Sequence, residues 1–473
     1  MFAFAIYDKN KSRLCLFRDH MGIKPLYYAY KNGFLSFSSE LKGLTSLFSV
    51  QGVGLEPDPG ALEFYAVFGY IPSPYTLYHD IAKLPKSSWL FFDLATKAPP
   101  KIFSYSLRDV AVTTRNEFMQ LIEERTLEHL ASDVPVGVFF SGGTDSSLIA
   151  SILHKYGINL KAFSIQMRGK EEDAYYFTEI SKRLGLHTEM HSFGVKEFDE
   201  IYPTVMKNID EPISDNSIFP TYYLSKKAAE EVKVVLSGEG GDELFLGYPR
   251  NLALERIRGK AEGYTLLDAL YTHLPFFRGK NFLFERLFMW TRQPVSYYLV
   301  HMSPSRGFAS SAAWHHAKEL IVESGVEPLA LDREFYLENN LLKKIDMATS
   351  YASIEGRVPL LDRGIVANAS RFNQFHLEGG VLKAMLKKIL TQYLPPELVY
   401  RGKSGFGMDL HQYFKESRYL KQDLERAIAF FTKKGMLLPK HLLQRQDVFI
   451  QRSPNYCFSL ISLYYAFQNT QKR

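Results

Sequence analysis

Residues 1–95 contain short runs of aromatic and β-branched residues that are separated by polar turns. Such runs predict β-strands, and turn signals such as Lys31-Asn32-Gly33 divide them. Residues 96–115, which include Ala98-Pro99-Pro100, predict a linker. The N-terminal part is therefore expected to consist mainly of strands, which this pattern places at residues 1–7, 13–17, 26–29, 34–38 and 89–93.

The pattern changes after residue 115. Residues 117–132 and 174–186 have helical spacing, whereas apolar runs before Ser141, at 160–167 and at 232–236 predict strands. Strands that alternate with helices predict a parallel, doubly wound sheet with functional loops at its carboxyl edge. Residues 251–473 are mostly helical in pattern. The expected fold class is therefore α/β with a helical C-terminal part.

A first glycine-rich loop follows the strand that ends near residue 140. The loop runs Ser-Gly-Gly-Thr-Asp-Ser-Ser over residues 141–147 and leads into an apolar helical pattern. A strand, a tight loop and a helix N-terminus together offer backbone N–H groups to phosphate oxygens. Asp145 supplies the carboxylate oxygens that a magnesium ion prefers. The alternative is an ordinary Ser-Gly-Gly turn, but the whole string on this frame favours a phosphate-binding loop.

A second loop, Ser-Gly-Glu-Gly-Gly-Asp-Glu over residues 237–243, also follows a buried strand. Its glycines allow a ligand to approach the backbone closely, and Glu239 and Asp242 place two carboxylates among them. It is not a dinucleotide-binding fingerprint, because Glu243 stands where that pattern requires glycine. The alternative is an acidic turn.

Two further clusters lie in the C-terminal half. Asp346 and Ser353 are seven residues apart, so a helix would place them on one face, and Pro359 would end that helix. This stretch also contains Glu355, Arg357 and Asp362, and it could equally be a salt-bridged helix end. The other cluster is Arg-Gly-Lys-Ser-Gly-Phe at residues 401–406. It is not a Walker A motif, but Lys403 on a glycine-flanked loop can neutralise a leaving pyrophosphate.

Composition limits the classes of protein to consider. A chain of 473 residues predicts two or three domains, and a net charge of +6 with scattered basic residues shows no nucleic-acid-binding arm. The two cysteines, Cys15 and Cys457, form no disulfide framework or metal pair, so a reducing cytoplasm is expected. No signal peptide and no run long enough to span a bilayer is present, so no membrane partner is expected.

The four clusters, in this order, resemble the glutamine-hydrolysing asparagine synthetase family. The first loop is similar to the pyrophosphate-binding loop of ATP pyrophosphatases. The resemblance implies a carbon–nitrogen ligase with an adenine-nucleotide α-hydrolase-like synthetase domain at residues 116–473. Such an enzyme converts aspartate to asparagine through a β-aspartyl-AMP intermediate, uses ATP and Mg²⁺, and releases AMP and pyrophosphate.

The resemblance also implies roles for individual residues. Those that would bind ATP divide into an adenosine group (Phe140, Ile165, Ser237 and Gly238) and a phosphate-loop group (Ser141, Gly142, Gly143, Ser146 and Ser147). Asp145 and Asp242 would bind magnesium, and Glu239 would be needed to form the intermediate. Lys403 would stabilise the leaving pyrophosphate, and Glu355 and Arg357 would shape the acceptor side.

Residues 1–95 resemble the second half of the glutaminase domain of the same family, which has an N-terminal-nucleophile fold of αββα layers. The resemblance implies a catalytic N-terminal cysteine that does not occur here, and Cys15 cannot replace it because it has no free α-amine. Three explanations are open: the start is internal to a longer gene, the other half is a separate glutaminase chain, or the gene has been reduced to ammonia use. The match that runs smoothly from Met1 favours the first. Without its partner strands and second layer, this half-domain is expected to expose apolar sheet faces and open strand edges.

Several alternatives remain open at this point. One alternative acceptor is another carboxylate, such as a sugar uronic acid, because Thr349-Ser350-Tyr351 departs from the family's usual Ser-Met-Ala beside Glu355. Asp409 and Lys86-Ser87 also depart from the usual pattern. A degenerate binding protein is disfavoured because the candidate site residues are intact, and no RNA-binding module supports a nucleic-acid modifier. A homodimer is possible.

Overall fold

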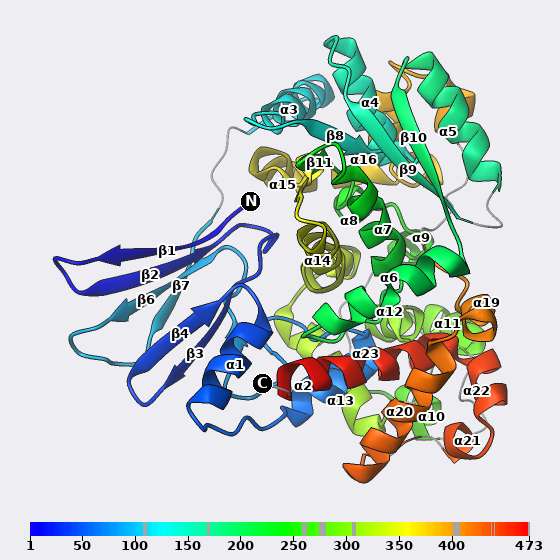
Figure 1. The fold of residues 1–473 in the computed structure, drawn as a ribbon. Helices are drawn as coiled ribbons and strands as arrows, with labels where there is room; N and C mark the ends of the chain where they lie inside the picture. Colours follow the sequence, from blue (N-terminus) through cyan, green and yellow to red (C-terminus); the bar gives the residue numbers. More distant parts are fainter. Residues whose placement is uncertain are drawn as a thin grey trace.

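The computed structural model describes residues 1–106, 111–167, 171–257, 263–273, 281–304, 309–400, 407–436, 438 and 440–471. The N-terminal unit, residues 1–104, contains two antiparallel sheets (Figure 1). One sheet has the order β1-β2-β6-β7, formed by Ala3–Asp8, Arg13–Arg18, Ser88–Asp93 and Lys101–Ser104. The other has the order β4-β3-β5, formed by Phe34–Ser38, Tyr27–Lys31 and Ala82–Lys83. These strands confirm the mixed α/β class together with the parallel sheet described below.

Two helices of this unit, α1 (Leu41–Val50) and α2 (Pro59–Phe68), lie between the predicted strands and were not predicted from the local pattern. Helix α1 buries Leu41, Leu44 and Phe48 at helical spacing. Helix α2 begins where the Asp58 side chain accepts a hydrogen bond from the Ala61 backbone. Residues 101–104 of the expected linker form β7, which pairs with β6, so the N-terminal sheet extends beyond residue 95.

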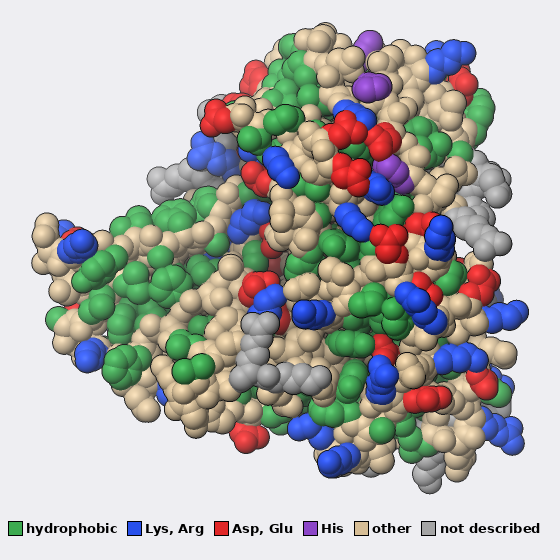
Figure 2. All heavy atoms as spheres, viewed as in Figure 1, with side chains coloured by type: hydrophobic (Ala, Val, Ile, Leu, Met, Phe, Trp, Pro, Cys, Tyr) green, Lys and Arg blue, Asp and Glu red, His purple; other side chains and the backbone are tan. Residues whose placement is uncertain are grey.

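An aromatic row crosses the four-stranded sheet on its outer face. Phe4, Phe17, Trp89 and Phe103 lie directly opposite one another on adjacent strands, and their rings stack in sequence. Phe4 is 43% exposed and Phe103 is 42% exposed. Figure 2 shows hydrophobic side chains gathered over this arm of the molecule. The apolar sheet face expected from the sequence is therefore accessible in the described chain.

A five-stranded parallel sheet forms the centre of the second part of the chain. Its order is β10-β9-β8-β11-β12, and every neighbouring pair is parallel. The five strands are β8 (Val136–Phe139), β9 (Lys161–Met167), β10 (His187–Phe193), β11 (Val234–Leu236) and β12 (Glu355–Arg357). Helices pack on both faces, and the sheet confirms the predicted doubly wound arrangement.

The structure corrects the expected helix around Asp346 and Ser353. Helix α14 (Lys343–Tyr351) ends before Ser353, which has a φ of +60°, so the two residues do not share a helical face. Residues 355–357 form β12 because their backbone completes the ladder beside β11. The expected helix therefore does not continue to Pro359, because residues 355–357 pair with β11, which is distant in the sequence.

Helices cover the sheet and build the C-terminal part. The helices of the described chain beyond residue 104 are α3 (Arg115–Glu128), α4 (Thr144–Lys155), α5 (Glu171–Arg183), α6 (Val195–Asn208), α7 (Ile218–Ala228), α8 (Gly241–Leu244), α9 (Pro249–Arg256), α10 (Leu266–His273), α11 (Asn281–Trp290), α12 (Pro294–Met302), α13 (Ser311–Ser324), η2 (Pro328–Ala330), η3 (Asp332–Leu342), α14, η4 (Pro359–Leu361), α15 (Arg363–Ala369), η5 (Ser370–Phe372), α16 (Asn373–His376), η6 (Glu378–Gly380), α17 (Ala384–Leu390), α18 (Pro396–Val399), α19 (Leu410–Glu416), α20 (Leu420–Lys433), α21 (Lys440–Gln444), α22 (Gln446–Arg452) and α23 (Pro454–Gln471). No helix of the described residues is long and apolar enough to cross a membrane.

His376, at the end of α16, is a buried histidine whose protonation links the stability of the fold to pH. Its side chain is 0% exposed, and its ring packs edge-on against Phe245 with 5.1 Å between ring centroids. Burial lowers the pKa of His376 to about 4, although a hydrogen bond with the Ala369 carbonyl opposes this shift. The native state therefore binds fewer protons than the unfolded state between pH 6.5 and 4.

This buried neutral histidine is expected to weaken the fold in acid. Its contribution is complete above pH 6.5 and is lost as the pH falls toward 4, by about 1.4 kcal/mol per pH unit and about 3 kcal/mol in all. In His376→Leu this loss should be absent. Urea unfolding of both proteins at pH 7 and pH 4 measures the difference, and equal losses in the two proteins would contradict the expectation.

Candidate functional site

A cleft of about 1370 Å³ opens at the carboxyl edge of the parallel sheet. The loops after β8 and β11 and residues 164–167 of β9 form one side, and residues of η3 and α14 form another. Its far end reaches α12 and the end of α2. The cleft therefore lies where doubly wound sheets bind their ligands.

The first glycine-rich loop has the geometry of a phosphate cradle. Gly142 has a φ of +67°, which turns the chain sharply between β8 and α4. The Ser141 backbone N–H donates to the Ser146 hydroxyl at 3.2 Å, and the two serine hydroxyls lie 3.2 Å apart. Gly143 is the N-cap of α4, so the positive end of the helix dipole points into the loop. This arrangement suits an anion.

The second loop packs directly onto the first. A Cβ on Gly238 would lie 2.8 Å from the Asp145 Cβ and 3.0 Å from the Ser146 nitrogen, so no larger residue fits there. Gly240, with a φ of +89°, turns the backbone into the short helix α8. The close contact brings Asp145 of the first loop beside Asp242 of the second.

Lys383 joins these two carboxylates. Its ammonium pairs with Asp145 and lies 2.6 Å from the Asp242 carboxylate. Burial by itself lowers the pKa of Lys383, but Asp145 and Asp242 raise it overall. Lys383 is therefore a fixed cation in the cleft. No local pattern in the sequence indicates its position between the carboxylates.

The two carboxylates also fit the expected magnesium ion. Because one ammonium contacts both of them, they are close enough to share a single cation. The described residues hold no group of three or more His, Cys, Asp or Glu side chains arranged for a metal. A pair of carboxylates that leaves the other positions to water and phosphate oxygens is the usual arrangement for Mg²⁺ with a nucleotide.

Glu239 enters the cleft from the second loop and is held by Lys344. The Lys344 ammonium lies 2.7 Å from the Glu239 carboxylate and is only 5% exposed. Burial lowers the pKa of Lys344, but Glu239 and Asp215 raise it overall. The sequence analysis did not identify Lys344 as the partner of Glu239. Its only indication in the sequence is that it stands two residues before Asp346.

Glu243 lies next to this group and was treated in the sequence only as a departure from another motif. Burial and the neighbouring Asp242 raise the pKa of Glu243 to about 8, although a hydrogen bond donated by Tyr248 opposes the shift. Glu243 is therefore mainly protonated at neutral pH, which limits the negative charge around Asp242.

The structure separates the other predicted residues into two groups. Cleft-lining residues include Phe140, Ile165, Ser237, Gly238, Ser141, Gly143 and Ser146. Gly142 and Ser147 are not among the lining residues, and Ser147 is 0% exposed within α4. Lys403 lies outside the described residues.

Glu355 and Arg357 are also not among the residues that line the cleft. Arg357 pairs with Glu355 at 3.1 Å and donates to the backbone carbonyls of His129 and Ala131 at 2.7 and 2.8 Å. These contacts tie β12 to the end of α3. We therefore propose an anchoring role for this pair in place of the expected contact with the acceptor.

Comparison with known proteins gives two family matches. The asparagine synthase profile matches residues 117–445, and the glutamine amidotransferase domain profile matches residues 1–102. A putative glutamine-hydrolyzing asparagine synthetase of Mycobacterium tuberculosis (strain ATCC 25618 / H37Rv) is 30% identical over 455 residues, covering 89% of this chain and 68% of that protein. Asparagine synthetase (glutamine-hydrolyzing) 1 of Bacillus subtilis (strain 168) is 29% identical over 88% of this chain and 68% of its own length. Asparagine synthetase B of Escherichia coli (strain K12) is 33% identical over 86% of this chain and 60% of its own length.

Proposed function

Because the chain belongs to the asparagine synthase family, we propose that it is a carbon–nitrogen ligase that uses ATP to convert aspartate to asparagine. One observation carries this proposal. Two glycine-rich loops at the sheet edge bring Asp145, Asp242 and Lys383 into contact beside a helix N-terminus that suits phosphate. The site therefore combines a phosphate cradle with fixed charge of both signs.

The first step of the proposed reaction activates the acceptor. A carboxylate oxygen attacks the α-phosphorus of ATP, the α–β phosphoanhydride bond breaks, and pyrophosphate leaves with the bond's electron pair. Ser141, Ser146 and the first turn of α4 bind the phosphates, while Lys383 offsets the charge of the leaving group. Lys403 is proposed to assist there. Asp145 and Asp242 would hold Mg²⁺, which supplies charge neutralisation of the phosphate oxygens when bound.

The second step forms the amide. Ammonia attacks the carbonyl carbon of the mixed anhydride, the C–O bond to AMP breaks, and one proton leaves the nitrogen. Glu239, which Lys344 holds in the cleft, is proposed to be needed in the preceding step, the formation of the β-aspartyl-AMP intermediate. Adenylation makes amide formation possible because a free carboxylate is a poor acyl donor at neutral pH.

The nitrogen source and partners follow from the same proposal. Residues 1–102 match a glutamine amidotransferase domain, so ammonia derived from glutamine is proposed wherever a complete glutaminase, in this or a separate chain, accompanies the synthetase site. Free ammonia is proposed to serve in its absence. A cytoplasmic location and a homodimer remain proposals from the sequence.

A second acceptor is also proposed because of the shape of the cleft. Beyond the phosphate loops the cleft continues to Phe68 at the end of α2 and to His301 on α12. This extension leaves room for a carboxylate larger than aspartate, such as a sugar uronic acid.

Pyrophosphate release distinguishes these functions. Purified chain is incubated with ATP, Mg²⁺ and ammonia, and either aspartate or a uronic acid is added. We expect release that depends on aspartate, together with equal amounts of asparagine and AMP. Release with the uronic acid alone would support the second acceptor, and no acceptor-dependent release would reject both.

A further inference from the structure

One long helical segment, residues 332–351, contacts the N-terminal unit and also lines the cleft. Figure 1 shows its α14 part between the strands of the N-terminal unit and α7. The segment consists of η3, which has the wide π-helical hydrogen-bond pattern, and α14. We call it the central helix. Long π-helical stretches are uncommon and often occur at functional sites.

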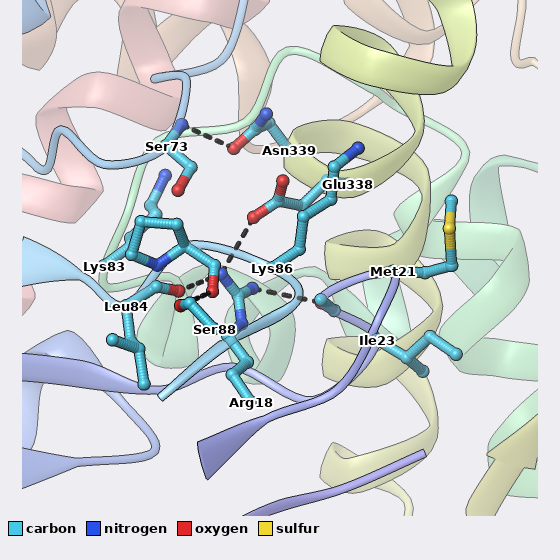
Figure 3. A network of polar contacts seen from close by, with 12 residues as sticks. Arg18, Met21, Ile23, Ser73, Lys83, Leu84, Lys86, Ser88, Glu338 and Asn339 are labelled. Carbon is cyan, nitrogen blue, oxygen red and sulfur yellow. Dashed lines mark hydrogen bonds and ion pairs between the residues drawn. The ribbon is translucent and has the colours of Figure 1, made fainter. Parts of the chain in front are cut away.

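One side of the central helix binds the N-terminal unit. Glu338 accepts a hydrogen bond from the Arg18 guanidinium at 2.8 Å, and both side chains are about 5% exposed or less. Asn339 accepts from the Ser73 backbone N–H at 2.8 Å, as Figure 3 shows. Nearer its C-terminal end, Asp346 pairs with Lys24 at 2.8 Å.

A buried ion cluster forms the centre of this contact. Glu211 is 0% exposed and pairs with Lys343 of the central helix and, at 2.6 Å, with Lys83 of the N-terminal unit. The Tyr27 hydroxyl donates to the same carboxylate at 2.8 Å. Burial raises the pKa of Glu211, but Lys343 and Lys83 hold it at about 2. The cluster is therefore charged, and both lysines depend on the single carboxylate of Glu211 for their neutralisation.

The other side of the central helix forms a wall of the cleft. Lys344, adjacent to Lys343, holds Glu239, and Asn340 donates to the Asp215 carboxylate at 2.9 Å. Tyr336, Leu341 and Ile345 of the same helix also line the cleft. Consecutive lysines thus contact opposite sides: Lys343 contacts the buried cluster and Lys344 contacts the candidate catalytic carboxylate.

We propose that Lys344 is a positioning residue for Glu239 and that the central helix transmits the packing of the N-terminal unit to the cleft through Lys343, Glu211 and Lys83. The proposal rests on the proposed function for the role of Glu239. Its physical basis is the rigidity of a helix whose two adjacent cations are both paired, with Lys344 buried and Lys343 13% exposed. A change in the partners of Glu211 shifts the position of Lys343, and Lys344 moves with it because the two residues are adjacent in one helix.

Lys83→Met tests the connection from outside the cleft. Hydrogen exchange of the backbone amides at residues 237–242 should become at least about tenfold faster, because Glu239 loses its fixed partner position. The kcat for ammonia-dependent pyrophosphate release should fall about tenfold while the KM for ATP stays within about threefold. Lys344→Met should produce the same split more strongly, and Lys344→Arg should restore most of kcat.

Lys318→Met is the matched control. Lys318 is 1% exposed and pairs with the fully buried Asp268 at 2.8 Å, in the helical part away from the central helix. This variant should lower the melting temperature as Lys83→Met does, yet leave loop exchange and kcat within about twofold of wild type. If Lys83→Met does not fold, Tyr27→Phe removes one hydrogen bond from the same cluster and should change loop exchange in the same direction.

The outcomes separate this inference from the proposed function. Faster loop exchange in Lys83→Met, with an inactive wild-type protein, would support the connection and reject the proposed function. Unchanged exchange and kcat in folded Lys83→Met would overturn the connection. An equal loss of kcat in Lys318→Met would also overturn it, because any buried charge would then have the same effect.

Discussion

Asp145→Asn is expected to reduce pyrophosphate release by about 100-fold to 1000-fold while leaving the protein folded. The substitution removes one of the two carboxylates that share Lys383 and the proposed magnesium ion. Asparagine is close in size to aspartate, and Lys383 keeps Asp242 as a partner, so packing is preserved. The initial rate of pyrophosphate release at increasing Mg²⁺ measures the effect, and half-maximal activity should require more Mg²⁺ than in the wild type.

The control for this variant is Asp58→Asn. Asp58 caps α2 by accepting a hydrogen bond from the Ala61 backbone at 3.0 Å, and asparagine caps helices equally well. Activity and stability should therefore stay close to those of the wild type. If Asp145→Asn released pyrophosphate at the wild-type rate at low Mg²⁺, the proposal that Asp145 binds magnesium would be rejected.

Gly247→Ala is expected to reduce pyrophosphate release by about 100-fold, although glycine has no reactive group. A Cβ at this position would lie 1.9 Å from an Asp242 carboxylate oxygen and 2.2 Å from the Lys383 Cε. Both side chains would have to leave their present positions, and a displacement of about 1 Å in a catalytic arrangement can reduce the rate about 100-fold. Steady-state pyrophosphate release measures the loss, and far-ultraviolet circular dichroism should remain unchanged.

Gly54→Ala is a matched control for the loss of a glycine. A Cβ at Gly54 meets no atom within 4 Å, so the substitution should leave activity unaffected. If Gly247→Ala retained activity within about threefold, the close packing of Asp242 and Lys383 would not be required for the reaction.

Local pattern was sufficient for much of the fold. The apolar runs before the two glycine-rich loops predicted β8 and β11, and alternation of strands with helices predicted the parallel sheet. Helices α1 and α2 lie between the predicted strands and were not predicted, because each is only ten residues long. Strand β12 was missed because three residues carry no period, and only pairing with β11 makes them a strand.

The same distinction holds for the candidate site. The loops containing Asp145 and Asp242 could be identified because glycine, hydroxyl and carboxylate residues stand together in sequence. Lys383 and Lys344 could not be assigned their partners, since each comes from a distant segment and forms its ion pair only after folding. Glu355 and Arg357 were expected at the acceptor side, but Arg357 donates hydrogen bonds to backbone carbonyls at the end of α3 and pairs with Glu355.

The sequence by itself determined the class of fold, the two phosphate-side loops and the family resemblance, because these depend on residue types within a few positions of one another. Tertiary structure alone decided which cation faces which carboxylate, and that Lys343 and Lys344 contact opposite sides of one helix. Ion pairs of this kind depend on the close approach of segments that are more than a hundred residues apart. Local sequence carries no information about that distance, so only the packed chain decides it.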